Sequence, residues 1–318
     1  MVNIFSKKRK NHSLFFNKKR NSPIVFLKKN VTGWIFILPT IVGIGLFVMY
    51  PIIQSIMYSF HEYDMLTVYN PIGLKNYIKV FTDPTSLKAL TNTVFFCATN
   101  IPMVLVLTFV LSLLLNINIP GMKAFRVMYY LPSIIPAIAG GILWSNLMKY
   151  GYESPGIFNK IRLMLGLDIS NFFYADGYEA IASILLMNLW TIGGGTIIWL
   201  AAFKDIPREL YEAADIDGAN KAVKLFKITI PQSAPLMLYN LVTLTIVSVQ
   251  FNGTIAFAPN IGAGTNDSTL MLGVKIYKDA FTKLDVGYAA ATSWVLMIIT
   301  ALLTLLMFKV SRKVGNDD

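Results

Sequence analysis

Charged residues are absent from six long stretches of this 318-residue chain, and the alternation of these stretches with charged segments is its dominant pattern. Each stretch consists mainly of Leu, Ile, Val, Phe, Ala and Met, without Lys, Arg, Asp or Glu. A helix needs about 20 mostly apolar residues to cross the hydrocarbon core of a bilayer, and each stretch is long enough. We therefore expect six transmembrane helices, near residues 33–60, 92–115, 125–148, 180–202, 236–257 and 287–308.

The composition agrees with a membrane protein. Hydrophobic residues make up 55% of the chain and charged residues 14%, whereas soluble domains carry about 25% charged residues. The single cysteine, Cys97, and the two histidines, His12 and His61, provide neither a disulfide framework nor a plausible metal cluster. We therefore expect no metal or cofactor to be bound by this chain.

The Lys and Arg residues set the expected orientation. Alternate segments starting with the N-terminal tail hold 19 of them, against 9 in the segments on the opposite side. Since short cytoplasmic segments carry the excess of positive charge, both termini are expected in the cytoplasm. The chain then divides into a basic tail at 1–29, a transmembrane domain at 30–310 and a short tail at 311–318. The basic N-terminal tail, which is expected to contact lipid headgroups, explains the net charge of +11, so no nucleic-acid partner is expected.

The charge-free stretches also bear on the energy source. Carriers driven by protons or sodium usually keep ionisable side chains at bilayer depth, and none occurs in these stretches. No G-x-x-x-x-G-K-[ST] phosphate loop occurs in the chain either, since the glycine run at 193–195 has no lysine after it. Close helix packing or a kink explains these glycines. Energy is therefore expected to come from a separate subunit, and this chain is not expected to be an enzyme.

A polar loop at 204–235 lies between the fourth and fifth predicted spans, on the cytoplasmic side by the charge count. Pro207 suits the start of a helix, and Gly218 lets the backbone turn at its end. A second short helix follows, with Lys221 and Lys224 along one side. Such a pair of short helices is either a solvated connector or a rigid docking element.

The residues of this loop resemble the EAA loop of ABC importer permeases. The match runs through Glu212-Ala213-Ala214-x-x-Asp217-Gly218-Ala219 and continues in Phe226-x-Ile228-x-Ile230-Pro231. The resemblance implies the type I ABC importer permease fold, all-α, in a multi-pass protein of the bacterial inner membrane. It also implies that Glu212, Ala213, Ala214, Asp217, Gly218 and Ala219 dock into a cytoplasmic ATPase, which uses the ATP and Mg.

Shorter matches extend the resemblance to carbohydrate-uptake permeases of the maltose type. They include Tyr130-Leu131-Pro132, Gly156-Ile157-Phe158-Asn159 and Ile276-Tyr277-x-x-Ala280-Phe281. One departure is the stretch at 260–264, where that group often has a T-x-G-G-P turn. The resemblance implies a homologous second permease subunit, two ATPase subunits, an extracytoplasmic solute-binding protein and a carbohydrate substrate.

Two polar and aromatic clusters lie inside the predicted fourth and fifth spans. Sugars are recognised by aromatic faces and by hydrogen-bonding amides, and related permeases contact sugar from these two helices. The resemblance therefore marks a substrate pathway at Asn188, Trp190, Gln250, Phe251 and Asn252. The alternative is that these polar groups only hold the helices together.

The sequence thus predicts a permease subunit of an ATP-driven importer for a sugar or oligosaccharide. A glycerol-phosphate or polyol cargo is one alternative, although an anionic cargo would favour basic residues along the path. An ion-coupled secondary carrier is another, and transport without any ATPase would favour it.

Overall fold

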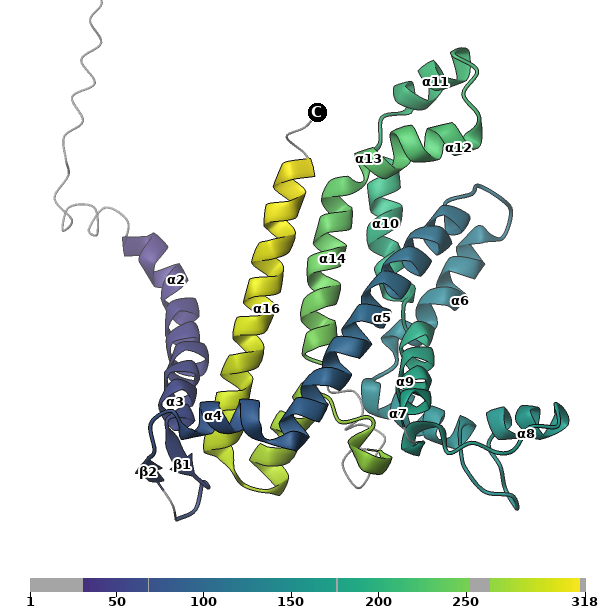
Figure 1. The fold of residues 1–318 in the computed structure, drawn as a ribbon. Helices are drawn as coiled ribbons and strands as arrows, with labels where there is room; N and C mark the ends of the chain where they lie inside the picture. Colours follow the sequence, from purple (N-terminus) through teal and green to yellow (C-terminus); the bar gives the residue numbers. More distant parts are fainter. Residues whose placement is uncertain (1–30, 68, 176, 252–263, 315–318) are drawn as a thin grey trace, which may run out of the picture. The chain divides into compact units, whose positions relative to one another are not determined.

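The computed structural model describes residues 31–67, 69–175, 177–251 and 264–314, and most of them are helical (Figure 1). The chain forms two compact units, residues 1–54 and 55–318. The first unit holds α2 (Val31–Ile44), the π-helical η1 (Gly45–Met49) and the start of α3 (Tyr50–Ser59). Most of its described side chains are apolar, in keeping with a helix of mean hydropathy high enough for a membrane span.

Three helices among the described residues are long and apolar enough to cross a membrane. Three further pairs of helices meet the same criteria if each bent pair counts as one span. The long helices run at 33–59, within α5 (Pro84–Leu115) and within α16 (Val286–Val314). The bent pairs are α6 (Met122–Ile134) with α7 (Ala137–Leu147), α9 (Tyr178–Trp190) with α10 (Gly193–Asp205), and 221–232 with α14 (Ala234–Val249).

The helix α5 starts earlier than the charge-free stretch indicated. Pro84 occupies its first turn, where the missing N–H costs no hydrogen bond, and the Asp83 carboxylate accepts from the Thr85 N–H at 3.2 Å. Lys88 therefore lies on a capped helical turn instead of in a loop. The charge-free stretch begins only after Lys88, whereas the helix already begins at Pro84.

The bends have local causes. The largest, 96°, separates α6 from α7 at Ile135, which is extended because Pro136 follows it. A bend of 65° precedes α14, where Pro235 lies in the first turn of the new helix. The bend of 51° between α9 and α10 falls at the start of the glycine run. Of the two explanations offered for these glycines, a kink is therefore observed here.

The second unit has one main core. Helix α14 packs against both α5 and α16, and α10 packs on α5 (Figure 1). The core draws a buried side chain from each of six helices: Phe96, Trp144, Ile184, Val249, Val274 and Leu296. Buried Ser and Thr hydroxyls bond the carbonyl one turn earlier in their own helix, as Thr93, Ser112 and Thr292 do.

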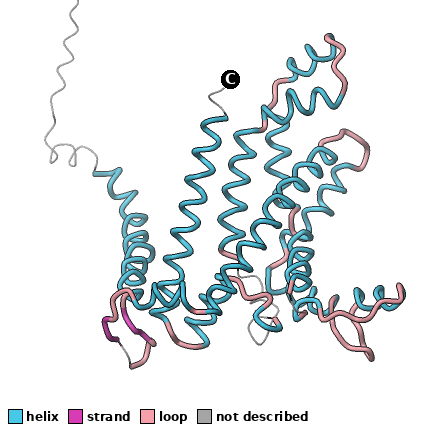
Figure 2. Tube along the Cα trace, in the orientation of Figure 1, coloured by secondary structure: helices cyan, strands magenta, loops and turns pink. Residues whose placement is uncertain are grey.

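Short elements occupy the two ends of this unit. At one end, α11 (Arg208–Ile216) is followed by α12 (Lys221–Lys224), the π-helical η3 (Leu225–Thr229) and α13 (Ile230–Gln232). At the other end, β1 (His61–Tyr63) pairs antiparallel with β2 (Tyr69–Pro71), Glu62 lying opposite Asn70, as Figure 2 shows in magenta. The same end holds α4 (Lys75–Thr82), α8 (Ile157–Met164), η2 (Phe172–Tyr174), η5 (Thr265–Asp267), α15 (Leu272–Tyr277) and the π-helical η6 (Lys278–Thr282).

Candidate functional site

The helical hairpin α11–α12 projects at one end of the second unit (Figure 1). Pro207 stands immediately before α11, and Asn220 caps α12 by accepting from the backbone N–H three residues on at 2.9 Å. Between the helices, Gly218 has a φ of +75°, which glycine adopts without a Cβ penalty. The N–H of Ala219 then donates to the carbonyl of Ala214 at 2.8 Å and closes the end of α11. The predicted helix start and the turn at Gly218 are therefore confirmed.

Two side-chain contacts brace the hairpin. Lys224 forms an ion pair with Asp215 across the turn. Nearer the base, the hydroxyls of Tyr211 and Thr229 share a hydrogen bond of 2.9 Å. An exposed ion pair contributes little by itself, but the second contact is half-buried and joins α11 to η3. The two short helices are thus held as one unit.

The hairpin presents both charged and apolar side chains on its surface. Glu212 and Asp217 are exposed, and neither carboxylate has a hydrogen-bond or ion-pair partner among the described residues. Ile216 is 87% exposed and Phe226 is 65% exposed, which is unusual for side chains of this size in a polar loop. Ala213 and Gly218 are exposed as well, whereas Ala214 and Ala219 are half-buried. The surface is suited to a partner that offers both apolar area and cationic groups.

A buried cluster connects the hairpin to the apolar helices. It contains Trp199, Phe203 and Ile206 at the end of α10, and Tyr211 packs against it. The indole N–H of Trp199 donates to the Thr108 hydroxyl of α5 at 3.1 Å. Close-packed side chains and this hydrogen bond therefore join the hairpin to α10 and α5.

A chain of hydrogen bonds crosses three of the apolar helices. The Asn188 amide of α9 donates to Oδ1 of Asn100 in α5 at 2.7 Å, and the Asn100 amide donates to the Ser248 hydroxyl of α14 at 2.9 Å. Asn100 is 3% exposed and Ser248 is 2% exposed. Since unpaired polar groups are costly in an apolar environment, these contacts hold the three helices in register.

The predicted aromatic residues lie against the main core. The Trp190 ring of α9 packs edge-on to Trp144, with centroids 6.1 Å apart, and Phe251 lies 4.7 Å from Phe96. Both Trp190 and Phe251 pack against the same buried cluster. The indole N–H of Trp144 is buried and has no hydrogen-bond partner in the described part of the chain.

The remaining pathway candidates are placed differently. Gln250 is exposed at the C-terminal end of α14, and Asn252 lies outside the described residues. The structure therefore packs Trp190 and Phe251 against one core, engages Asn188 in the polar chain and leaves Gln250 exposed. Asn100 and Ser248, which complete the polar chain, were not among the predicted residues.

The glycine run brings two helices into close contact. A Cβ at Gly193 would collide with the backbone carbonyl oxygen of Tyr129 in α6, whereas one at Gly194 would lie 3.7 Å from Ser133. The first glycine is therefore required by backbone contact, and the second is not. The predicted close packing is confirmed at Gly193.

Residues 84–316 match the family model described as the binding-protein-dependent transport system inner membrane component. This chain belongs to that family. The permease is similar to the probable ABC transporter permease protein YesP of Bacillus subtilis (strain 168), with 34% identity over 88% of this chain and 90% of the relative. It is also similar to the lactose transport system permease protein LacF of Rhizobium radiobacter, with 31% identity over 89% of this chain and 95% of the relative.

The fold of the permease matches a solved transporter chain. In the crystal structure of a bacterial alginate ABC transporter in complex with an alginate pentasaccharide-bound periplasmic protein, a chain with 22% identity covers 91% of this permease. The match spans 96% of that chain and has a TM-score of 0.79. The predicted family, sugar ABC importer permeases, and the placement in the inner membrane are confirmed.

The permease also contains a charge cluster that was not predicted. Lys275 and Asp279, one helical turn apart in α15 and η6, form an ion pair in which both side chains are 1% exposed. The Lys275 ammonium lies 3.6 Å from Asp83 before α5 and 4.5 Å from the ring centroid of Tyr288 in α16. The Tyr288 hydroxyl donates to Asp83 at 3.1 Å. The ends of α5, α15 and α16 therefore meet at one buried lysine.

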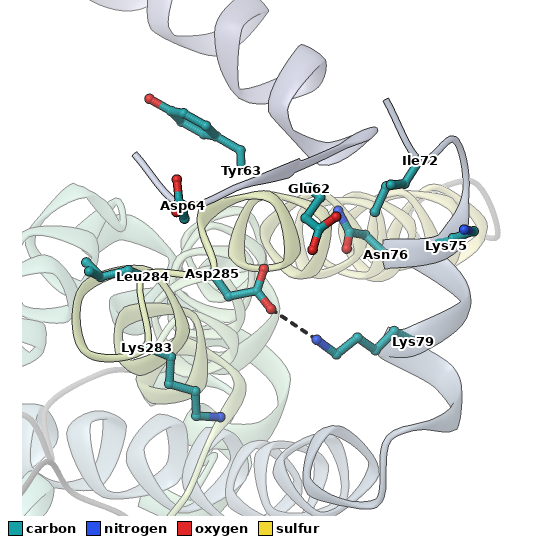
Figure 3. Close-up of a pocket in the computed structure, with 10 residues that line it drawn as sticks. All are labelled: Glu62, Tyr63, Asp64, Ile72, Lys75, Asn76, Lys79, Lys283, Leu284 and Asp285. Carbon is teal, nitrogen blue, oxygen red and sulfur yellow. Dashed lines mark hydrogen bonds and ion pairs between the residues drawn. The ribbon is translucent and has the colours of Figure 1, made fainter. Parts of the chain in front are cut away.

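The outer part of this cluster borders a pocket of about 490 Å³ (Figure 3). There Lys79 of α4 pairs with Asp285 at 3.0 Å, and Lys283 pairs with the buried Asp279 at 2.8 Å. Glu62 lies on the same pocket wall and makes no ion pair with any described residue. Three lysines and three aspartates thus form a balanced set, partly buried and partly open to solvent.

One carboxyl group and one ammonium group of this cluster, those of Asp83 and Lys283, have shifted pKa values. Partial burial raises the pKa of Asp83, but hydrogen bonds from a backbone N–H in α5 and from Tyr288, together with Lys275, outweigh it and hold that pKa below 3.8. The hydrogen bond to Asp279 raises the pKa of Lys283 above 10.5, against partial burial, which lowers it. Both groups are therefore held in their charged forms.

Sequence reasoning offered one weak signal for this cluster. Lys275, Asp279 and Lys283 stand four residues apart, which places them on one face of a helix. Such a pattern is typical of a solvated helix surface, and nothing local indicated that Asp83 would cover it.

Proposed function

We propose that this chain forms half of the membrane pathway of an ATP-driven importer for a sugar or oligosaccharide. The observation that carries the proposal is the braced, exposed hairpin α11–α12 with its EAA residues. Its unpaired carboxylates, Glu212 and Asp217, and its exposed Ile216 and Phe226 form a surface for a cytoplasmic ATPase. A bidentate arginine of that partner would suit the Glu212 carboxylate.

Coupling would proceed as a rigid-body movement. The ATPase subunits would bind ATP with Mg and close on each other, and each would carry the seated hairpin with it. Because the hairpin is fixed to Trp199 and Phe203 of α10, its displacement would move α10 against α5. In this proposal the permease catalyses no covalent step and binds no cofactor.

We assign six membrane crossings with both termini in the cytoplasm. The three long helices and three bent pairs are compatible with this number, and the excess of Lys and Arg on alternate segments supports the orientation. The hairpin then faces the cytoplasm. The pocket near β1 and the charge cluster then face the extracytoplasmic side.

The cargo would pass close to the polar chain and the aromatic residues. Asn188, Trp190 and Phe251 would contribute from the core region, with Gln250 and Asn252 at the end of α14. A neutral saccharide is favoured because the charge-free stretches offer no basic side chain to an anion. LacF, the similar permease from Rhizobium radiobacter, belongs by name to a lactose system, which supports this choice.

The complex would contain further subunits. A homologous second permease would complete the pathway, and two ATPases would occupy the cytoplasmic side. An extracytoplasmic binding protein would deliver the sugar, as supported by the alginate transporter, whose structure includes a periplasmic protein carrying an oligosaccharide.

Co-purification from native membranes, followed by ATPase assays with candidate oligosaccharides, tests this function. We expect Glu212→Ala to release the ATPase or to abolish sugar-stimulated hydrolysis. Glu209→Ala, an exposed carboxylate on the same helix outside the motif, should leave both unchanged. If the chain purifies alone and moves sugar with an ion gradient, the proposal is wrong and an ion-coupled carrier takes its place. Stimulation by glycerol phosphate or a polyol alone would replace the proposed cargo.

A further inference from the structure

The charge cluster has an arrangement that a simple structural ion pair does not need. Asp279 accepts from both Lys275 and Lys283, and Lys275 lies near both Asp279 and Asp83. Each central group therefore has a second partner. One contact can lengthen while the other still compensates the buried charge.

Burial of these groups is costly unless their charges stay paired. Lys275 and Asp279 are each 1% exposed, whereas Asp83 is 24% exposed and Lys283 is 54% exposed on its side chain. The exposed fraction thus increases from the central pair to its alternative partners. Replacing a buried pair by apolar side chains often costs nothing in stability, so stability alone does not explain a lysine at this position.

The segment that carries the cluster is also irregular. Asp279 lies in the π-helical turn η6, a conformation that is rare and often marks functional positions. Leu284 follows with a φ of +57°, which is strained for a residue with a branched side chain. At the start of α16, a Cβ on Gly287 would collide with the backbone oxygen of His61. The join between η6 and α16 is therefore tightly constrained on one side and borders the pocket on the other (Figure 3).

We propose that Lys275 and Asp279 are positioning residues of the transport cycle, which hold the outer ends of α5 and α16 together and exchange partners with Asp83 and Lys283 when these ends shift. This inference rests on the proposed function, because it needs a cycle in which the outer helix ends move. Two apolar side chains in place of Lys275 and Asp279 would hold the ends of α5 and α16 together equally well, but they would have no second partner when these ends shift.

The first experiment separates positioning from packing. Lys275→Met leaves Asp279 with a single, exposed partner, and we expect it to lower the thermal stability of the assembled complex. The double variant Lys275→Met with Asp279→Leu removes both buried charges and should restore stability and assembly. Its sugar-stimulated ATPase rate should nevertheless stay about fivefold or more below wild type, the lower end of a typical coupling between sites. Recovery of the rate along with stability would overturn the proposal.

If the double variant does not fold, a milder variant still tests whether the buried pair exchanges partners. Lys283→Met removes the second partner of Asp279 and leaves the buried pair in place. We expect normal assembly, unchanged half-saturation by sugar and a lower maximal rate. Lys278→Met is the matched control and should behave as wild type, because Lys278 starts the π-helical turn that Lys283 follows and has no ion-pair partner among the described residues. Equal rates in the two variants would refute the exchange of partners.

Failure of the partner exchange can be distinguished from failure of the proposed transport function. If wild-type complex shows no sugar-stimulated ATPase activity and Glu212→Ala changes nothing, the coupling itself is absent. If wild type is stimulated and Glu212→Ala is not, the function stands, and the rates of the Lys283 and Lys278 variants decide the role of the charge cluster.

Discussion

Asn188 of α9 donates a hydrogen bond of 2.7 Å to Asn100 of α5, and this contact bears on the predicted sugar pathway. The amide that was expected to face the cargo is already engaged with another helix. Asn100 in turn donates to Ser248 of α14, so a single buried amide joins three helices. Any sugar contact by Asn188 would use its amide oxygen or its second N–H, or would displace this bond.

The first prediction concerns this polar chain. Asn100→Leu leaves the Asn188 amide and the Ser248 hydroxyl without their partner, and we expect a loss of about 1–3 kcal/mol in the unfolding free energy of the complex. Thermal or SDS unfolding of the purified complex measures it. Asn146→Leu is the control, because Asn146 is exposed and, among the described residues, its side chain bonds only a carbonyl of its own helix. Equal stability of both variants would contradict the role of Asn100.

The second prediction concerns the turn of the hairpin. Gly218→Ala places a Cβ in a left-handed conformation and costs about 1–2 kcal/mol locally. We expect a lower affinity for the ATPase and weaker stimulated hydrolysis. Gly166→Ala is closely matched, since Gly166 has a φ of +73° and, like Gly218, open space around it, but it follows α8 at the other end. It should carry a similar local cost without any loss of ATPase binding.

The third prediction separates two adjacent glycines. Gly193→Ala forces the backbones of α6 and α10 apart, because its Cβ would collide with the carbonyl oxygen of Tyr129. We expect a large loss of stably folded permease, as seen in detergent by size-exclusion chromatography. Gly194→Ala meets only the Ser133 side chain at ordinary contact distance and should fold and transport almost normally. Comparable yields of the two variants would argue against the close contact.

The fourth prediction concerns pH. The pKa of Asp83 is held below 3.8 in the folded permease, so its ionised form contributes stability above that value. This contribution is lost as the pH falls through the lower folded-state pKa. Wild type should therefore unfold at a higher temperature than Asp83→Asn at neutral pH, with the gap closing under strongly acid conditions. A constant gap across the whole acid range would exclude an ionic role for Asp83.

The sequence predicted much of the hairpin and less of its surroundings. Pro207 and Gly218 act through local backbone chemistry, and such effects are visible in a single segment. Asn100 was missed because a lone asparagine in an apolar helix gives no sign of which helices it joins. The cluster at Lys275 was missed for a similar reason: its partner Asp83 is distant in sequence, and burial was decided by tertiary packing. The 96° bend at Ile135 was also missed, since apolar composition does not report the direction of a helix.

The two bracing contacts of the hairpin have a consequence for how importers of this kind diversify. Its stiffness depends on Asp215 with Lys224 and on Tyr211 with Thr229, whereas the surface offered to a partner includes Ile216 and Phe226. Rigidity and recognition are therefore encoded by separate side chains. If an ATPase docks on this hairpin as proposed, exchanging the exposed residues alone would reassign the transporter to a different ATPase, while the contacts that join the hairpin to α10 and α5 stay intact.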